Sequence, residues 1–182
     1  NEITVNTPDN STIAYKYSLT GSSDLKNLTS GRVPLTGGIA AELQLATGDF
    51  EADLTLNRTR ARLRVLGLVP VTADIAFDQS GKTVGSLKSG VLSATARFKI
   101  KIPRAYLFGV LPIAGSDACQ TKSSSIASLR STGGFFDPLA GGRLVGSYGI
   151  SDLQGCGWLN DIISPLTKGG GNSIDITLKP AN

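Results

Sequence analysis

Apolar and polar residues alternate with a period of two along most of this chain. The pattern is clear over Ile13, Tyr15, Tyr17 and Leu19, which alternate with smaller or polar neighbours. Successive side chains of a strand point to opposite faces, so this period indicates antiparallel β-strands with one buried and one solvent-facing side. The same alternation recurs in residues 43–45, 50–56, 59–65, 69–77, 92–102, 144–150 and 174–178.

The connections between these segments are short and rich in turn-forming residues, as in Asp78–Gly81, Gly133-Gly134 and Asp137–Gly142. The 22 Gly and 8 Pro residues of the chain agree with a fold that has many turns. This spacing predicts an all-β fold, either an antiparallel β-sandwich or an up-and-down barrel. No linker or repeat divides the 182 residues, so we expect a single domain over 1–182.

One short helix is expected near the C-terminus. Its apolar residues are spaced as one face of about two helical turns, and Pro165 is expected to end it. We expect this apolar face to dock on the sheet rather than to bind a partner. The residues of the face are Trp158, Leu159, Ile162, Ile163 and Leu166.

The composition argues against an enzyme. The chain has no His, which excludes Ser-His-Asp and Cys-His catalysis as well as imidazole zinc sites, and its two Cys cannot form a four-Cys zinc site. Neither a nucleophile elbow nor a phosphate-binding loop is present. Glu51 and Asp53 share one face of a strand, but a solvated pair explains them better than a catalytic pair. We therefore predict no catalytic residue, no metal and no cofactor.

Other features point to export. The sequence begins at Asn1, contains no Met and has no apolar run near the roughly 20 residues of a membrane-spanning helix, which favours a mature chain without its signal peptide. Cys119 and Cys156 most simply form a disulfide, although two buried thiols in a cytosolic protein are the alternative. We expect a secreted or envelope-associated, extracytoplasmic protein. The net charge of +4 contains no run of five like charges, so nucleic acid is not an expected partner.

Two ladders of cations are candidate anion-binding features. One interpretation is a strip for phosphate, sulfated glycans or anionic lipid headgroups. The favoured one is ion pairing on the solvent face, because Glu51 and Asp53 precede the arginines and Asp74 and Asp78 follow them in what would be a meander. The ladders are Arg58, Arg60, Arg62 and Arg64 on one strand and Arg97, Lys99 and Lys101 on another.

Some features suggest contact with an apolar molecule. Small inward residues leave room for a ligand or allow tight packing, and tight packing is favoured. The aperiodic apolar segment Tyr106–Ala114 fits a cavity rim or a membrane-touching loop, but a buried crossover is favoured. Of Phe135 and Phe136, only one can point inward, and the other is a candidate contact. The inward alanines are Ala52, Ala61, Ala73, Ala94 and Ala96, and the candidate contacts are Tyr106, Phe108, Leu111, Phe135 and Phe136.

The chain also resembles a family. The resemblance runs from about residue 40 to the end. It rests on Thr47–Leu56, Leu66–Val71, Cys119-Gln120-Thr121, Phe136–Ile150, Leu153–Gly157, Asn160–Ile163 and Gly171-Asn172. In these segments the chain is similar to a large group of secreted proteins of actinobacteria. Only Gly169-Gly170 departs from the family pattern, which has Gly-Pro there. The resemblance implies export and a Cys119–Cys156 bridge, and it transfers no functional residue.

The sequence is compatible with two classes of function. The first is an envelope protein that binds or shields an apolar molecule such as a lipid, isoprenoid or sterol, and this predicts an internal cavity of at least roughly 300 Å³. The second is a structural or surface-interaction protein, such as an envelope coat, an adhesin or a self-assembling homo-oligomer. It predicts a filled core and a flat apolar patch around Phe135, Phe136 and residues 106–114. A porin subunit fits less well, because charged residues occupy the outward faces.

Overall fold

The computed structural model describes residues 11–28, 31–65, 68–114, 116–157 and 160–181. These residues form antiparallel strands and one short helix, α1 (Asn160–Thr167). The strands are β1 (Thr12–Asp24), β2 (Arg32–Gln44), β3 (Asp49–Leu56), β4 (Thr59–Val65), β5 (Val69–Gln79), β6 (Thr83–Lys88), β7 (Val91–Leu107), β8 (Leu111–Ala114), β9 (Gln120–Thr121), β10 (Ser125–Ser131), β11 (Gly142–Ile150), β12 (Leu153–Gln154) and β13 (Gly169–Pro180).

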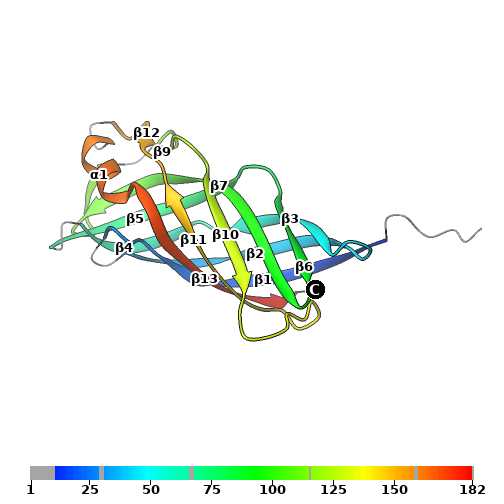
Figure 1. The fold of residues 1–182 in the computed structure, drawn as a ribbon. Helices are drawn as coiled ribbons and strands as arrows, with labels where there is room; N and C mark the ends of the chain where they lie inside the picture. Colours follow the sequence, from blue (N-terminus) through cyan, green and yellow to red (C-terminus); the bar gives the residue numbers. More distant parts are fainter. Residues whose placement is uncertain (1–10, 29–30, 66–67, 115, 158–159, 182) are drawn as a thin grey trace, which may run out of the picture.

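Eight of the strands close into a barrel, in the order β10-β11-β13-β1-β2-β3-β6-β7 with β7 paired again to β10. The all-β prediction is confirmed, and of its two architectures the sandwich is wrong. Closure hydrogen-bonds each of these strands on both sides, which removes the free edges that two open sheets would leave. Figure 1 shows the barrel from the side, with its strands inclined across one another.

The order of the strands departs from a simple meander between β3 and β7. Strand β3 pairs with β2 and β6, whereas β4 and β5 attach to the barrel through β7. The 17-residue β7 is long enough to have several partners: β6 and β10 lie beside its first half, and β5, β8 and β9 lie beside its second half. Strand β7 therefore joins the closed barrel to the additional strands.

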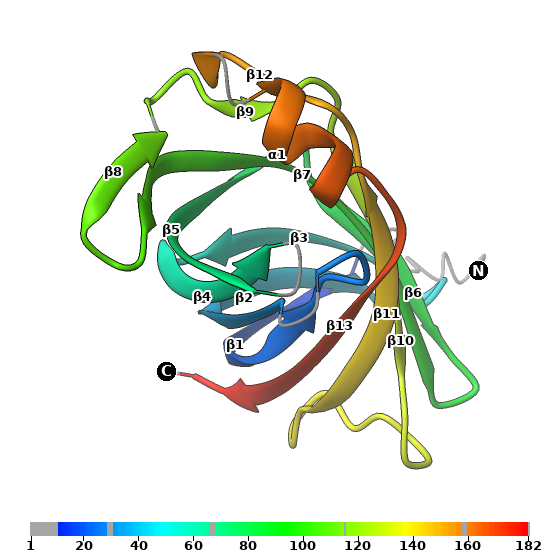
Figure 2. The same cartoon turned by 90° about the vertical axis from the view of Figure 1, so that its left-hand side faces the viewer.

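The two ends of the barrel are built differently. At the end near Leu107 the opening carries the β1–β2 connection, β8, β9, β12 and α1, and we call it the capped end (Figure 2). At the other end, near Val91, short turns connect β2 to β3 and β6 to β7 and a longer segment connects β10 to β11, and we call it the hairpin end. One of these turns contains Ser89 and Gly90, which both have positive φ angles.

Glycines permit the closest approaches between strands. A Cβ at Gly37 of β2 would overlap the carbonyl oxygen of Thr55 in β3, and a Cβ at Gly146 of β11 would overlap that of Ser128 in β10. A side chain at either position would push the neighbouring backbone away. These glycines therefore fit the strong coiling that an eight-stranded closed barrel requires.

The interior holds the apolar side of the alternating strands, as the two-residue period predicts. Leu19 and Leu144 are only 2% exposed, and Ala127 is completely buried. Phe98 lies near the middle of β7, and its ring packs against Phe77 and Tyr148 with centroid distances of 6.0 and 5.7 Å. These contacts belong to one apolar cluster that runs through the barrel.

Helix α1 extends two residues past Pro165, so the prediction that Pro165 ends the helix is wrong. The fixed φ of proline is itself compatible with helical backbone, and the amide of Lys168 still donates to the carbonyl of Ser164 at 2.9 Å. The expected docking of the helix face concerns Trp158 and Leu159, which lie outside the described residues, and Ile162, Ile163 and Leu166, whose side chains are also outside the description.

Within the described residues, no helix has the length and hydrophobicity that crossing a bilayer requires.

Candidate functional site

The barrel contains an apolar cavity of about 250 Å³ at its capped end. The β7 residues that line it lie between Phe98 and Leu107, so it extends from the middle of the barrel toward the cap. The β1–β2 connection contributes Leu25 and Leu28, and β8 contributes Ile113. The walls carry Val33, Leu35, Leu56, Leu63, Val69, Val71, Ala73, Ile75, Ile100, Ile102, Ala105, Leu153 and Ile174.

A row of alanines accounts for much of this space. The registers of β4, β5 and β7 place Ala61 opposite Ala73, and Ala73 opposite Ala105. All three are at most 4% exposed, and Ala73 and Ala105 line the cavity. In the next row toward the cap, Leu63 faces Val71, so larger side chains resume immediately. Ala73 and Ala105 thus leave a gap that their neighbours do not fill, whereas Ala61 beside them does not line it.

The few polar side chains in the cavity wall are bonded to other protein groups. The hydroxyl groups of Ser23 and Tyr148 share a buried hydrogen bond of 2.7 Å, and Thr121 Oγ1 accepts one from the amide of Ile100 at 3.2 Å. Burial raises the pKa of the Tyr148 phenol, which keeps this group neutral. The described wall of this cavity therefore offers apolar contacts, and the hydroxyl groups of Ser23, Thr121 and Tyr148 are already bonded.

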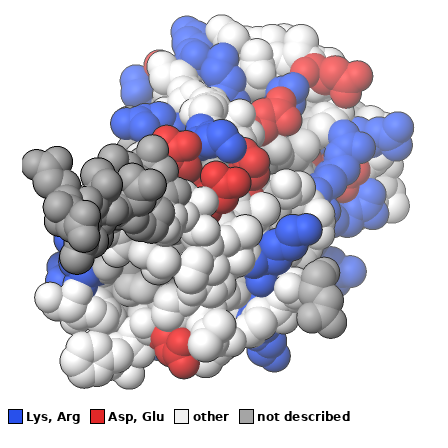
Figure 3. Space-filling view, turned by 90° about the vertical axis from the view of Figure 1, so that its right-hand side faces the viewer, with Lys and Arg blue, Asp and Glu red and all other residues white. Residues whose placement is uncertain are grey.

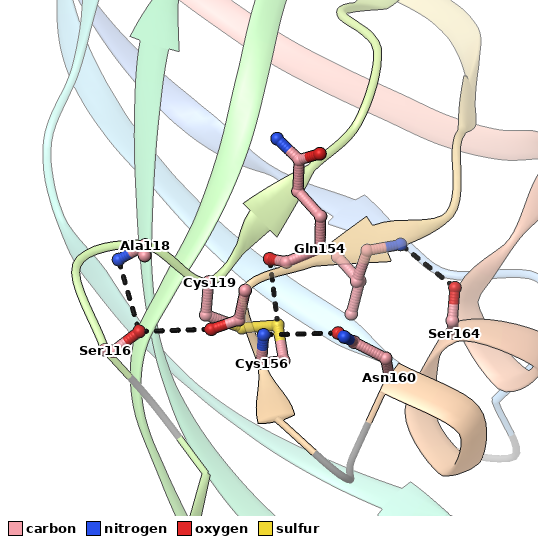
Figure 4. The surroundings of a disulfide bond; sticks show 9 residues. Ser116, Ala118, Cys119, Gln154, Cys156, Asn160 and Ser164 are labelled. Atoms are coloured by element: carbon pink, nitrogen blue, oxygen red, sulfur yellow. Dashed lines mark hydrogen bonds between the residues drawn. A yellow bond between two sulfur atoms is a disulfide. The ribbon is translucent and has the colours of Figure 1, made fainter.

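A disulfide between Cys119 and Cys156 fastens the cap beside the cavity, which confirms the predicted pairing (Figure 4). Cys119 is 1% exposed and packs with Leu153 and Ile102, both of which also line the cavity. The amide of Cys156 donates to Asn160 Oδ1 at 3.2 Å, which ties the bridge to the first residue of α1. The bridge therefore joins the segment before β9 to the segment between β12 and α1.

Asp152 and Ser164 hold α1 against the end of the barrel. The hydroxyl of Ser164 accepts from the amide of Leu153 at 2.9 Å and donates to Asp152 Oδ1 at 3.1 Å. Lys168 Nζ donates to the other carboxylate oxygen of Asp152, also at 3.1 Å. The hydrogen bonds from Lys168 and Ser164 lower the pKa of Asp152, so its carboxylate stays charged in this arrangement.

A second, smaller cavity of about 60 Å³ lies toward the hairpin end. Ala52 and Ala94 line it, together with Tyr17 and Phe136. Tyr17 is 7% exposed, and its hydroxyl donates to the carbonyl of Pro138 at 2.5 Å. This bond fastens the long β10–β11 connection over the hairpin end.

Tyr17 gives the first testable prediction. Burial raises the pKa of Tyr17 to about 12, with smaller contributions from Tyr15 and Asp137. An unfolded tyrosine has a pKa near 10, so the unfolded chain loses this proton first as the pH rises. The stability that Tyr17 contributes is thus complete below about pH 10 and is lost between about pH 10 and 12, by up to about 2 kcal/mol after screening.

Urea unfolding across this pH range checks the prediction. Tyr17→Phe is expected to lose about 1 kcal/mol at neutral pH, because the bond to Pro138 is gone. Above about pH 10 its stability should fall less steeply than that of the parent protein. Tyr15→Phe, on the same strand, is the control. Parallel alkaline profiles of the parent protein and Tyr17→Phe would contradict the prediction.

The inward alanines divide into two groups. Ala73 lines the large cavity, and Ala52 and Ala94 line the small one. Ala61 and Ala96, each 1% exposed, line neither cavity. The favoured interpretation, tight packing, therefore agrees with Ala61 and Ala96, whereas Ala52, Ala73 and Ala94 line cavities.

The cationic ladders are only partly ion-paired. Arg60 binds Asp74 at 2.8 Å, and Lys101 binds Asp78 at 2.6 Å, as the solvent-face interpretation predicts. The guanidinium of Arg60 lowers the pKa of Asp74, so this carboxylate stays ionised to lower pH. The described residues show no ion pair for the remaining five ladder cations, Arg58, Arg62, Arg64, Arg97 and Lys99.

The expected pairing of the arginines with the strand before them is wrong. Strand β4 does not hydrogen-bond to β3, so Asp53 pairs instead with Lys82 at 3.3 Å. Glu51 lies opposite Glu42 in the β2–β3 register. The two ladders are themselves separated by β5, so they do not form one continuous strip. On the face shown in Figure 3, Lys and Arg side chains are interspersed with Asp and Glu.

The five candidate apolar contacts lie at opposite ends of the barrel. Phe136 is buried at the hairpin end, whereas Phe135 beside it is 86% exposed, so only one of the two points inward as predicted. Phe108 and Leu111 lie in the β7–β8 hairpin at the capped end and are 65% and 56% exposed, with Tyr106 partly buried before them. A single flat patch joining these groups, as the second function predicts, is therefore wrong.

The interpretation of Tyr106–Ala114 as a buried crossover is also wrong. The segment is the end of β7, a tight turn and β8, and Val110 in the turn is 80% exposed. The turn forms because Phe108 and Gly109 both adopt positive φ angles, 51° and 76°. Phe is rare at such a position, so composition gave no signal for a turn.

Sequence reasoning missed several residues of the large cavity. Leu25 and Leu28 lie in a connection with no apolar period, and Ala105 follows Pro103 near the end of β7. The alternation along 92–102 can be extended to Ala105 only with a shift in period, and the register of β5 with β7 does shift between Asp74 and Ala76. That irregularity was not visible in the sequence.

Comparison with protein-family models, with curated proteins and with solved structures finds no match to this chain. The resemblance to secreted proteins of actinobacteria therefore stays a prediction. Among the described residues, no group of three or more His, Cys, Asp or Glu is placed to hold a metal ion.

Proposed function

We propose that this protein is a non-enzymatic, extracytoplasmic binding protein that holds an apolar molecule, or the apolar chain of a larger lipid, in the cavity at its capped end. The cavity of about 250 Å³ with an apolar wall is the observation that carries the proposal. A disulfide agrees with an oxidising compartment outside the cytoplasm.

The size of the cavity narrows the class of ligand. Small-molecule sites usually begin at roughly 300 Å³, so the cavity size expected for this function from the sequence is not reached, and only a small ligand fits. An engineered apolar cavity of roughly 150 Å³ binds benzene, and scaling by volume gives room for about ten carbons. A straight or branched hydrocarbon chain of this length fits, whereas a fused-ring sterol is too large. The proposal is therefore narrower than the range of lipids that the sequence suggested.

The interior polar groups favour a ligand whose buried part is wholly apolar. Ser23, Thr121 and Tyr148 already have hydrogen-bond partners in the wall. A headgroup placed among them would lose its hydration without gaining a bond, which is unfavourable by roughly 1–3 kcal/mol per polar group. We therefore expect any headgroup to remain at the capped end, outside the cavity.

Native mass spectrometry of the secreted protein, before and after organic extraction, tests the proposal. We expect an extractable adduct in a one-to-one ratio, or, for the extracted protein, uptake of one added decanol. Decanol near a hundred times its dissociation constant should raise the free energy of unfolding by about 2.7 kcal/mol. Cholesterol, added in parallel, should give neither effect. A protein that carries no adduct and is not stabilised by decanol would rule the proposal out.

A further inference from the structure

The capped end carries an exposed apolar lip beside the cavity. The lip consists of Leu68 in the β4–β5 turn and Phe108, Val110 and Leu111 in the β7–β8 hairpin, which are 84%, 65%, 80% and 56% exposed. The two turns adjoin, because the amide of Phe108 donates to the carbonyl of Pro70 at 3.0 Å. Figure 2 shows β5 and β8 on the same side of this end.

Phenylalanine at position 108 is unfavourable for the stability of the isolated protein. Phe108 and Gly109 are the central residues of a two-residue turn in which both have positive φ, and the amide of Val110 donates to the carbonyl of Leu107 at 3.2 Å. This geometry favours Asn-Gly, and a bulky side chain is strained in it. The β6–β7 turn at the hairpin end has closely similar φ angles, with Ser89 in place of phenylalanine. A strained phenylalanine that is also exposed to solvent points to a contact outside the chain.

Unpaired cations flank the lip. Arg62 and Arg64 are exposed on β4, and neither has an ion pair with a described carboxylate. Arg64 lies opposite Pro70, whose carbonyl holds Phe108, so about two strand spacings, roughly 10 Å, separate their backbones. The sequence has no acidic residue in 62–72 or in 104–114, and Asp74, which follows in β5, is paired with Arg60.

We infer that the protein docks by this lip on an anionic lipid surface, with the apolar tips entering the headgroup region and Arg62 and Arg64 contacting lipid phosphates. Exposed apolar side chains beside unpaired arginines have the composition of surfaces that lie in a membrane interface. The long arginine side chains can reach the phosphates while the tips lie deeper. This inference does not depend on what occupies the cavity.

The same features disfavour a second copy of this chain as the occupant. A symmetric contact between two lips would bring Arg62 and Arg64 of one copy near those of the other, with no carboxylate between them. A lipid surface instead supplies the opposite charge and an apolar layer together. The lip also adjoins the cavity, since Leu107 and Ile113 on either side of the turn both line it. A hydrocarbon chain leaving a membrane at the lip is thus already next to the proposed binding site.

Cosedimentation with vesicles tests the inference. The probes are vesicles of phosphatidylcholine alone and of phosphatidylcholine mixed with phosphatidylglycerol. We expect binding to the mixed vesicles that weakens as salt is added. Phe108→Asn should reduce this binding about tenfold or more, because a large apolar side chain is lost from the interface. The substitution suits the turn, so its folded state should be at least as stable as the parent. Leu139→Ser, an exposed leucine at the hairpin end, is the matched control and should bind normally.

The arginines are tested in the same assay. Arg62→Gln and Arg64→Gln should each weaken binding to the mixed vesicles about fivefold, and Arg130→Gln on β10 should not. Ala105→Phe, which fills the cavity, should still bind vesicles, so failure of the proposed ligand site is separable from failure of this surface. Absence of vesicle binding, equal binding to neutral and anionic vesicles, or unchanged binding by Phe108→Asn would each overturn the inference. Concentration-dependent dimers that Phe108→Asn abolishes would overturn it in favour of a second copy.

Discussion

Replacing Cys119 and Cys156 together by alanine is expected to lower the free energy of unfolding by about 4 kcal/mol. The bridge joins residues 37 positions apart, and the chain-entropy model gives roughly this value for such a loop. Alanine fills the buried Cys119 position without adding a polar group, so the loss reports the bridge rather than a new unsatisfied hydroxyl. Urea unfolding of the parent and variant under oxidising conditions measures it.

The location of the disulfide also predicts which elements lose local stability when it is removed. The bridge packs on Leu153 and Ile102, which line the large cavity, and it is tied to α1 through Asn160. We therefore expect faster hydrogen exchange in β9, β12 and α1, with little change in the strands of the hairpin end. The cap should also release a bound chain more quickly.

A matched control separates the bridge from its surroundings. Ser116→Ala removes the hydroxyl that donates to the Gly155 carbonyl at 3.2 Å, in the same pair of loops. This variant should lose about 1 kcal/mol or less. If the double alanine variant is as stable as Ser116→Ala, the disulfide does not stabilise the cap.

The strands could be predicted from the sequence because burial leaves a direct trace in the order of residues. Tyr15, Tyr17 and Leu19 alternate in the sequence, and the structure places Tyr17 and Leu19 in the core. The choice between sandwich and barrel left no such trace. It depends on the pairing of β7 with β10, in which Ala96 lies opposite Ala127, and the same alternation suits either architecture.

The sequence could not predict the cavity, for a related reason. It lies where Ala73 of β5 and Ala105 of β7 face each other, and that pairing is set by the register of the two strands rather than by the sequence neighbours of each residue. The same holds for the acid–base pairs, since Asp74 meets Arg60 through the β4–β5 register. Local patterns give the strands, and the registers between strands then decide which side chains meet.

At the lip, the local composition of the sequence gave a wrong prediction. The segment around Phe108 contains only apolar residues and glycine, so composition favours burial. The structure places it in an exposed turn, because Gly109 and the strained Phe108 reverse the chain. The sequence preferences for burial and for turn residues both fail at Phe108, whose backbone is strained. Such failures concentrate at functional positions.

Leucine in place of alanine is expected to have opposite effects at two places in the barrel. Ala73→Leu and Ala105→Leu add side chains to the large cavity, so each should raise the stability of the empty protein by about 1 kcal/mol. Ala96→Leu adds the same atoms where no cavity exists, and overpacking there should lower stability by about 1–3 kcal/mol. Thermal and urea unfolding of the extracted proteins distinguish the two signs.

The leucine substitutions that stabilise the empty protein should weaken the binding of decanol. Ala73 and Ala105 lie directly opposite each other, so two leucines together add six carbons to a space that holds about ten. The excluded part of the ligand loses about 0.8 kcal/mol per methylene, so decanol binding should weaken about a thousandfold or more in the double variant. Ala96→Leu should bind decanol as the parent does, provided it is measured where it is folded. If the double variant is stabilised but still binds decanol normally, the binding site lies elsewhere in the protein. If the double variant is destabilised as much as Ala96→Leu, the row of alanines is tightly packed and encloses no cavity.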